Sequence, residues 1–228
     1  MADTVPLGRR IATEGVGAFF LFAAVVGSGV MAQALSGGNG GVALLANSIA
    51  TGAILFVLIT MLGPISGAHM NPAVTMAAAL RRDLPWRDAG AYTAAQIAFG
   101  IGGAWAAHLM FDLPVLQLSM KARTGAGQWA GETVATFGLV LTIFGTMRHR
   151  PQAVAASVAL YITAAYWFTS STSFANPAIT IARSLSDTFA GIAPRDVPLF
   201  VAGQLAGALA ATVAAGWLFP GKRQNLSC

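Results

Sequence analysis

Six runs of mostly apolar residues constrain this chain more than any other feature. A membrane-spanning helix needs about 20 such residues. Only 9% of the 228 residues are charged and 56% are hydrophobic, whereas about 25% of a soluble domain is charged, so soluble and disordered folds are excluded. The sequence therefore predicts an all-α, multi-pass protein of the lipid bilayer. The predicted spans are 11–35, 42–63, 89–111, 128–147, 152–170 and 197–219.

Several other classes of function are excluded by the same sequence. The formal net charge of +5 does not indicate a nucleic-acid partner, because the basic residues stand in short clusters between the apolar runs. The one cysteine, Cys228, allows no internal disulfide and no thiolate metal site. No nucleotide-binding loop, plausible pair of catalytic carboxylates or cluster of metal ligands is present. We expect no enzyme, no cofactor and no metal.

Two further apolar stretches, 71–80 and 176–186, are too short to cross a bilayer. Each would form roughly 15 Å of helix, which is about half of a hydrocarbon core. Both open with asparagine, a strong N-cap, followed by proline, which costs no hydrogen bond at the first helical position. We expect two half-helices whose N-termini lie near the membrane centre. The two motifs are Asn71, Pro72, Ala73 and Asn176, Pro177, Ala178.

The two halves of the chain repeat one order of elements. We expect a single transmembrane domain, 1–228, in which residues from about 9–111 form the first copy and about 128–219 the second. Each copy has three spans, and an odd number turns the second copy upside down in the membrane. Such inverted repeats place the transport site at the midplane, where the broken helices meet.

Polar residues inside the spans are also paired between the two copies. Glu14 matches Glu132, and Gln96 matches Gln204, each early in its span. Charges inside a membrane are costly and point to a role. The glutamates are either structural acceptors for the loops that lead to the half-helices or proton carriers of an ion-coupled transporter. Their symmetry favours the structural role, and the glutamines read as contacts between helices.

Basic residues gather on one side of the predicted bundle, which orients it by the positive-inside rule. Six spans bring both termini to that side, so the sequence predicts that both termini are cytoplasmic. The side with the termini holds Arg9, Arg10, Arg81, Arg82, Arg87, Arg148, Arg150, Lys222 and Arg223, and the opposite side holds Lys121, Arg123, Arg183 and Arg195.

The segment Ser66–Thr75 reads Ser-Gly-Ala-His-Met-Asn-Pro-Ala-Val-Thr and resembles the first signature of the aquaporin and aquaglyceroporin family. The second Asn-Pro-Ala and the paired glutamates and glutamines extend this resemblance over nearly the whole chain. It implies a right-handed bundle of six spans and two half-helices. It also implies a homotetramer with one pore per subunit, which passes water or small neutral solutes.

The half-helices explain how such a pore would select. Two helix N-termini that face each other place positive dipole ends at the pore centre, which opposes the entry of cations. Asn71 and Asn176 can offer amide hydrogens to a passing oxygen, whereas an ion loses its hydration without enough compensation. His69 either lines the pore, where its protonation could gate flow, or only orients its loop.

Family distances from the two motifs give the filter positions. The resemblance implies an arginine directly after the second Asn-Pro-Ala, and this chain has Ile179 there. A one-residue shift in the second loop would place Ala165 and Phe174 in the filter, in the positions otherwise taken by Ala164 and Ser173. Arg183 stands one turn further and either lines the outer vestibule or reaches the headgroups. The predicted filter is Thr51, Ala164, Ser173 and Ile179.

This filter has no charge, no histidine and no definite aromatic residue, so we expect a wide pore for larger uncharged solutes. Residues 176–192 are similar to a bacterial aquaglyceroporin branch associated with arsenic resistance, whose members also replace the arginine. That resemblance implies flow of arsenite, antimonite or methylated arsenicals beside glycerol-like polyols, and a place in the bacterial inner membrane. Two alternatives stay open: a water-selective aquaporin with an atypical filter, and an ion-coupled secondary transporter.

Overall fold

The computed structural model describes residues 5–220. Within that range the chain is helical and contains no strand, and two 3-10 turns, Pro151–Ala153 and Pro194–Asp196, precede the sixth and eighth helices. Lys222, Arg223 and Cys228 lie outside the described residues. The helices are α1 (Leu7–Leu35), α2 (Gly40–Ser66), α3 (Pro72–Leu80), α4 (Trp86–Met110), α5 (Ala126–His149), α6 (Val154–Phe168), α7 (Pro177–Ser184) and α8 (Val197–Leu218).

The long helices follow the predicted spans with two differences in detail. The helices α1, α2, α5 and the stretch Pro194–Leu218 are long and apolar enough to cross a membrane. Helix α4 has 25 residues but is more polar, since Gln96 and His108 lie within it. Helix α6 has only 15 residues, against the predicted 152–170. It starts after a 3-10 turn and ends at Phe168, where the chain becomes extended to form the second motif loop.

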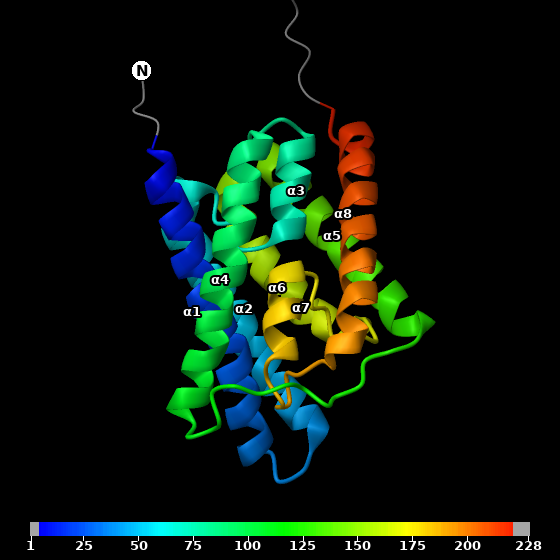
Figure 1. Cartoon of the computed structure of the whole chain (residues 1–228). Coiled ribbons are helices and arrows are strands. Elements are labelled where there is room, and N and C mark those ends of the chain that lie inside the picture. The colour runs from blue at the N-terminus through cyan, green and yellow to red at the C-terminus, as the bar shows by residue number, and fades with distance from the viewer. Residues whose placement is uncertain (1–4, 221–228) are drawn as a thin grey trace, which may run out of the picture.

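The two half-helices meet in the middle of the bundle. Helix α3 has nine residues and α7 has eight, as expected for stretches too short to span. Figure 1 shows α3 entering from the end where α1 begins and α8 ends, which we call the termini end, and α7 entering from the other end. The connection 111–125 between α4 and α5 crosses that other end, which we call the loop end.

Close packing of small residues holds the helices around this centre. Helix α1 packs mainly against α4, and α5 packs mainly against α8. A Cβ on Gly103 of α4 would collide with the backbone of Phe19, and one on Gly207 of α8 would collide with the backbone of Thr133. These glycines therefore set the close approach of the helix pairs, as small residues do in membrane bundles.

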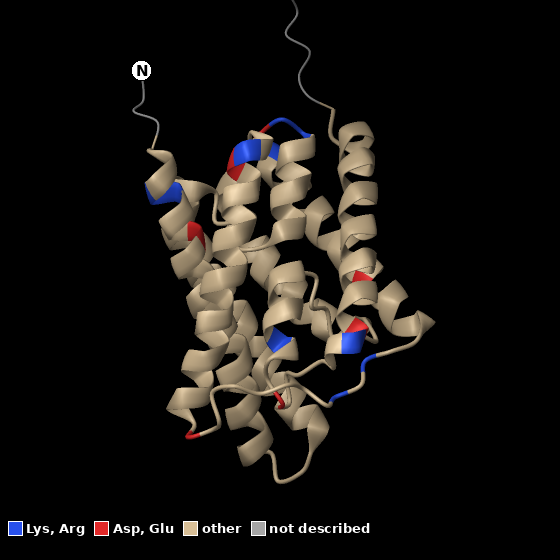
Figure 2. Cartoon of the chain, in the orientation of Figure 1, with Lys and Arg blue, Asp and Glu red and all other residues tan. Residues whose placement is uncertain are grey.

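Charge and apolar surface are distributed as a bilayer requires. Figure 2 shows most Lys, Arg, Asp and Glu residues gathered toward the two ends of the bundle. The outer faces of the helices carry large exposed apolar side chains, among them Phe20, Leu160, Val213 and Trp217. Exposed apolar surface of this extent would be costly in water and is suited to contact with lipid.

Candidate functional site

Each motif asparagine caps its own half-helix. The Asn71 Oδ1 accepts a hydrogen bond from the backbone N–H of Ala73 (2.9 Å). The Asn176 Oδ1 accepts from the backbone N–H groups of Ala178 (3.0 Å) and Ile179 (3.3 Å). Proline follows at the first helical position in both copies. The helix-start chemistry predicted from the sequence is therefore present twice.

The same two asparagines also tie the motifs to each other. The Asn71 Nδ2 donates to the carbonyl of Ala175 (2.7 Å), and the Asn176 Nδ2 donates to the carbonyl of Met70 (2.9 Å). A primary amide carries two donor hydrogens. One is used in this exchange, so one on each asparagine stays available to a molecule beside it. Both side chains line the central cavity described below.

A buried carboxylate holds each loop that leads to a half-helix. Glu14 accepts hydrogen bonds from the backbone N–H groups of His69 (2.9 Å) and Met70 (2.6 Å). Glu132 accepts from the backbone N–H groups of Phe174 and Ala175, both at 2.8 Å. Both glutamates have 0% exposure, and neither lines the cavity. These hydrogen bonds are those expected of acceptors for the motif loops, the role that the symmetry of the sequence favoured for both glutamates.

These bonds fix loops with an uncommon backbone. Ala68 and Met70 in the first loop, and Ser173 and Ala175 in the second, have φ angles between 47° and 50°. Non-glycine residues in this left-handed region cost about 1–3 kcal/mol each and persist only where surrounding contacts hold them. The glutamates provide such contacts to the residue directly before each asparagine.

The paired glutamines complete this framework. The Gln96 Nε2 donates to Glu14 (2.8 Å) and to the Thr75 hydroxyl (3.0 Å). The Gln204 Nε2 donates to Glu132 (2.5 Å) and to the Thr180 hydroxyl (2.8 Å). Both glutamines are fully buried and therefore bind helices together, away from the cavity.

One cavity passes both asparagines. It begins near Asp83 and Met147 at the termini end and reaches Arg183 toward the loop end. One part of its wall is apolar side chains, and another is the two motif loops. Of the residues proposed from the sequence to line a pore or filter, those that line this cavity are Thr51, His69, Asn71, Ser173, Phe174, Asn176, Ile179 and Arg183.

Ala164 is the exception, and its placement from the sequence was wrong. Ala164 is exposed on the outside of α6, and the alternative Ala165 is buried but does not reach the cavity. Ile162 and Tyr166, one helical turn apart, line the cavity instead. Ala164 stands two positions from each of these residues, and two positions along an α-helix turn a side chain by about 200°.

Tyr166 adds an aromatic hydroxyl that sequence reasoning missed. Its hydroxyl lies 3.1 Å from the Thr51 hydroxyl. Because Thr51 donates to the carbonyl of Asn47 (2.9 Å), Tyr166 is the donor in this pair. The only sequence signal for the inward position of Tyr166 is its place in a row of apolar residues four apart along α6. The cavity wall beside Thr51 therefore contains an aromatic side chain, whereas the filter predicted from the sequence has no definite aromatic residue.

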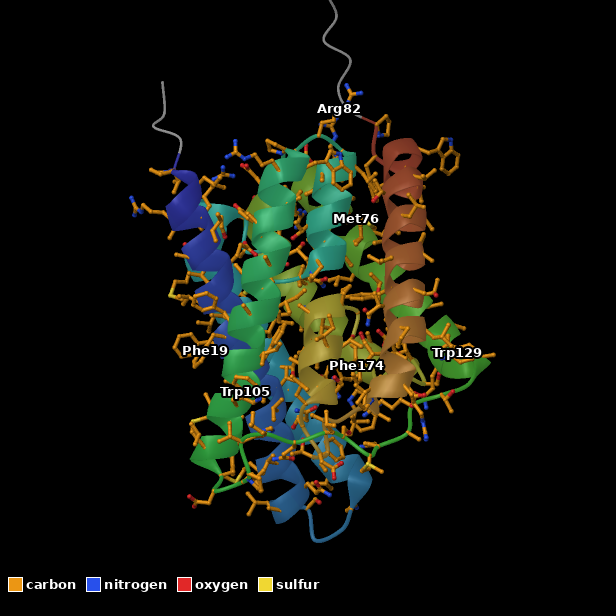
Figure 3. The ribbon with its side chains drawn as sticks, viewed as in Figure 1. Phe19, Met76, Arg82, Trp105, Trp129 and Phe174 are labelled. Atoms are coloured by element: carbon orange, nitrogen blue, oxygen red, sulfur yellow. The ribbon has the colours of Figure 1, made fainter. Side chains whose placement is uncertain are left out.

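Arg183 is inside the protein and does not reach toward headgroups. It is 2% exposed, and its Nε donates to the carbonyl of Ala190. Its guanidinium lies 3.3 Å from the centre of the Phe174 ring. Figure 3 shows Phe174 in the interior beside α7, whereas Phe19 lies at the periphery. This buried position fits the alternative in which Arg183 lines the outer vestibule.

The connection between α4 and α5 brings two more cations to the same end. Arg123 is 8% exposed, and its guanidinium lies 4.8 Å from the centre of the Phe174 ring. The Lys121 Nζ donates to the carbonyl of Phe189 (2.6 Å). Burial, and then the charges of Arg123 and Arg183, lower the pKa of Lys121 to about 8. Nothing in the sequence around 123 indicated this inward position.

Potential metal ligands do not cluster in the part of the chain that the structure describes. The two ion pairs among those residues are both at the termini end, between Arg10 and Asp88 (2.7 Å) and between Arg81 and Asp83 (3.3 Å). The cavity is lined by hydroxyls, amides, an imidazole and apolar side chains, with Asp83 at the termini end and Arg183 toward the loop end.

Comparison with known proteins agrees with this geometry. The family model described as Major intrinsic protein matches residues 1–169. The chain is 57% identical over 212 residues to the aquaglyceroporin AqpS of Rhizobium meliloti (strain 1021), covering 93% of this chain and 91% of that relative. It is 30% identical over 213 residues to aquaporin NIP1-1 of Oryza sativa subsp. japonica, covering 92% and 74%.

A solved structure supports the fold independently. The X-ray structure of the aquaglyceroporin from Plasmodium falciparum superposes with a TM-score of 0.72 at 16% sequence identity, covering 94% of this chain and 96% of that one. The paired motifs, the central cavity and these matches lead to one conclusion. The chain is a multi-pass membrane protein of the major intrinsic protein family, whose members are passive channels and not enzymes.

Proposed function

We propose that this protein is a passive channel for small uncharged solutes, with glycerol-like polyols as main substrates and water passing beside them. The observation that carries the proposal is the single cavity that runs past both motif asparagines. An aquaglyceroporin 57% identical to the chain supports the choice of substrate class. Two half-helix N-termini at the centre oppose cations, while neutral solutes meet hydrogen-bond donors there.

The mixed lining of the cavity suits polyols. A polyol has a hydroxylated side and a carbon side. Asn71 and Asn176 offer amide hydrogens, and Leu21, Val74 and Ile162 supply apolar wall. A solute with both kinds of surface can exchange its hydrogen bonds with water for hydrogen bonds with the asparagines, while its carbon side contacts the apolar wall.

Arsenite, antimonite and methylated arsenicals are the second part of the proposed substrate range. Arsenite at neutral pH is an uncharged trihydroxide and resembles glycerol in its hydrogen-bonding groups. Residues 176–192, with Ile179 in place of an arginine, support this choice. Uptake of arsenite into proteoliposomes should exceed the rate of bare liposomes. Uptake at the bare-liposome rate would remove metalloids from the range.

Water selectivity is the alternative that one observation favours. Tyr166 and Phe174 line the cavity and bring aromatic bulk where we expected small residues. An aromatic constriction narrows a pore and favours water over polyols. Against it, the family arginine is absent at Ile179, and a relative 57% identical to this chain carries the name aquaglyceroporin.

An ion-coupled transporter is the weaker alternative. Glu14 and Glu132 do not line the cavity, and their oxygens accept hydrogen bonds from loop backbone and glutamines. A proton carrier must instead exchange with the transport path. Uptake of labelled glycerol should therefore reach the same level with and without an imposed proton gradient. Accumulation driven by that gradient would contradict a channel.

Orientation and assembly follow from the same proposal. We place the protein in a bacterial inner membrane, with 9–111 and 128–219 as inverted copies and with both termini in the cytoplasm. The distribution of cations supports this orientation, because Arg123 and Arg183 at the loop end are buried and only Arg195 there is an exposed arginine. We also propose a homotetramer, to be checked by native mass spectrometry in detergent.

A further inference from the structure

The loop end of the cavity carries a buried cation whose terminal nitrogens are free. Arg183 is 2% exposed and lines the cavity. Its Nε donates to the carbonyl of Ala190, and its terminal nitrogens have no hydrogen-bond partner among the described residues. A buried guanidinium keeps five donors and a permanent charge. Its two terminal nitrogens are therefore available to whatever passes through the cavity.

A second arginine, Arg123, comes to the same end of the protein from a distant part of the chain. The Arg123 Nε donates to the carbonyl of Gly191 (2.8 Å), and its Nη1 donates to the carbonyl of Ser171 (3.2 Å). These bonds tie the connection between α4 and α5 to the chain on both sides of α7. Arg123 does not line the cavity, so it acts through its field and through what it positions.

Phe174 joins the two arginines into one unit. The guanidinium groups of Arg183 and Arg123 lie over its ring, at 3.3 Å and 4.8 Å from the centre. The ring also packs edge-on against Phe200, with centres 5.3 Å apart, and the backbone N–H of Phe174 is held by Glu132. A guanidinium over an aromatic face gains cation–π attraction, which offsets part of the repulsion between two like charges.

The acidic residues nearby do not neutralise this pair. Asp196 accepts the backbone N–H of Arg123 (2.7 Å), and Asp187 accepts the backbone N–H of Met120 (2.9 Å). Neither carboxylate forms an ion pair with Arg123 or Arg183 within the described part of the chain. Glu132 also acts on both arginines, but it does not line the cavity and accepts hydrogen bonds from Phe174, Ala175 and Gln204. The charge that faces the cavity at the loop end is therefore that of Arg183, and the low dielectric of its buried surroundings strengthens its field.

We propose that Arg183, held over Phe174 together with Arg123, is the residue that excludes cations at the loop end of this channel. It takes over the charge and donors of the arginine that the family resemblance implies at Ile179. It stands one turn further from the asparagines, which leaves the filter wider while keeping its selectivity against cations. This inference rests on the proposed function as a channel for neutral solutes.

Urea and guanidinium are the pair of probes that tests this role. They have nearly the same size and planar shape, but urea is neutral and guanidinium carries a permanent positive charge. Labelled uptake of each is measured at low concentration into proteoliposomes of the full chain and into empty vesicles. The wild-type protein is expected to pass urea and to hold guanidinium at the rate of empty vesicles.

Arg183→Met is expected to raise the ratio of guanidinium uptake to urea uptake by about tenfold or more. Arg183→Lys keeps the charge and should keep guanidinium excluded. Arg123→Met removes a charge that does not line the cavity, together with the hydrogen bonds to Gly191 and Ser171, so we expect a smaller rise of about threefold. Arg195→Met, which removes an exposed arginine at the same end, is the matched control and should change neither uptake.

The outcomes separate this inference from the function on which it rests. A wild-type protein that passes neither urea nor glycerol contradicts the channel itself. Wild-type urea uptake, with guanidinium still excluded by Arg183→Met, overturns the role of Arg183. Arg183→Gln, which retains an amide donor toward Ala190, repeats the comparison if Arg183→Met does not insert. Loss of urea uptake in both uncharged variants also overturns the proposal, because it assigns Arg183 to folding.

Discussion

The two motif loops are built on one framework and differ in what they present to the cavity. In both copies a glutamate accepts the two backbone N–H groups before the asparagine, and a glutamine links that glutamate to a threonine. In both copies the asparagine also donates to the loop of the other copy. The shared contacts are those that hold a strained loop at the centre of a membrane.

The differences lie at matching positions around each asparagine. Two residues before it, the first copy has His69 and the second has Phe174. Seven residues after it, the first copy has Ala78 and the second has Arg183, and all four residues line the cavity. Framework and chemistry are thus carried by different residues, so the chemistry of one half can change while its geometry is kept.

Breaking the framework should give the largest effect, and it should do so equally in both halves. Glu14→Ala and Glu132→Ala each leave two backbone donors without an acceptor, at about 1–3 kcal/mol per buried donor. We expect both variants to lose most folded protein and solute flux, measured by thermal unfolding in detergent and by glycerol uptake. Wild-type melting and flux in either variant would contradict the structural role of that glutamate.

Restoring the family arginine should give the next largest effect. Ile179→Arg adds a long cationic side chain to the cavity one turn from Arg183, so we expect glycerol flux to fall by about tenfold or more, with a smaller fall for water. Stopped-flow light scattering measures both rates. Ile179→Met, which adds no charge, is the control and should stay near wild type. Unchanged glycerol flux in Ile179→Arg would show that this position does not face the path.

The wall contributed by α6 should have a moderate effect. Tyr166→Ala removes the ring that lines the cavity near Thr51, and we expect glycerol flux to rise about threefold and a four-carbon polyol to enter. Ala164→Leu is the matched test of the position first assigned from the sequence. Because Ala164 is exposed, its enlargement should leave both rates unchanged. If Ala164→Leu changed the two rates and Tyr166→Ala did not, Ala164 would be assigned to the filter again.

The smallest expected effect comes from Lys121. Its pKa of about 8 reflects burial and repulsion by Arg123 and Arg183. Lys121 therefore loses its charge as the pH rises through that value, which weakens the positive field at the loop end. We expect guanidinium uptake to rise by about twofold between about pH 7 and about pH 9, with urea uptake unchanged. Lys121→Met should abolish this pH dependence, and a retained dependence would assign it to another group.

Much of the fold could be predicted from the sequence because the membrane imposes strong rules. Apolar length fixes spans, and a short apolar stretch after Asn-Pro reads as a half-helix, which α3 and α7 confirm. The pairing of Glu14 with Glu132 pointed to a shared structural role, and their hydrogen bonds are those of such a role. These features depend on local sequence and symmetry, so they are visible without coordinates.

The lining at the loop end was harder to predict, for two physical reasons. Tyr166 lines the cavity and Ala164 does not, because a shift of two residues on a helix turns a side chain to the opposite face. Arg123 reaches Phe174 from a connection 51 residues away in the sequence. An irregular connection has no periodicity, so its inward side chains cannot be distinguished from its exposed ones.

The most direct test of the account compares two osmotic challenges in stopped-flow light scattering on wild-type proteoliposomes. One challenge uses an impermeant osmolyte and the other uses an inward glycerol gradient. We predict fast shrinkage in both and fast re-swelling only with glycerol, as a channel for neutral solutes requires. Fast shrinkage in both without re-swelling would contradict it, because the cavity beside Tyr166 and Arg183 would then pass water and exclude polyols.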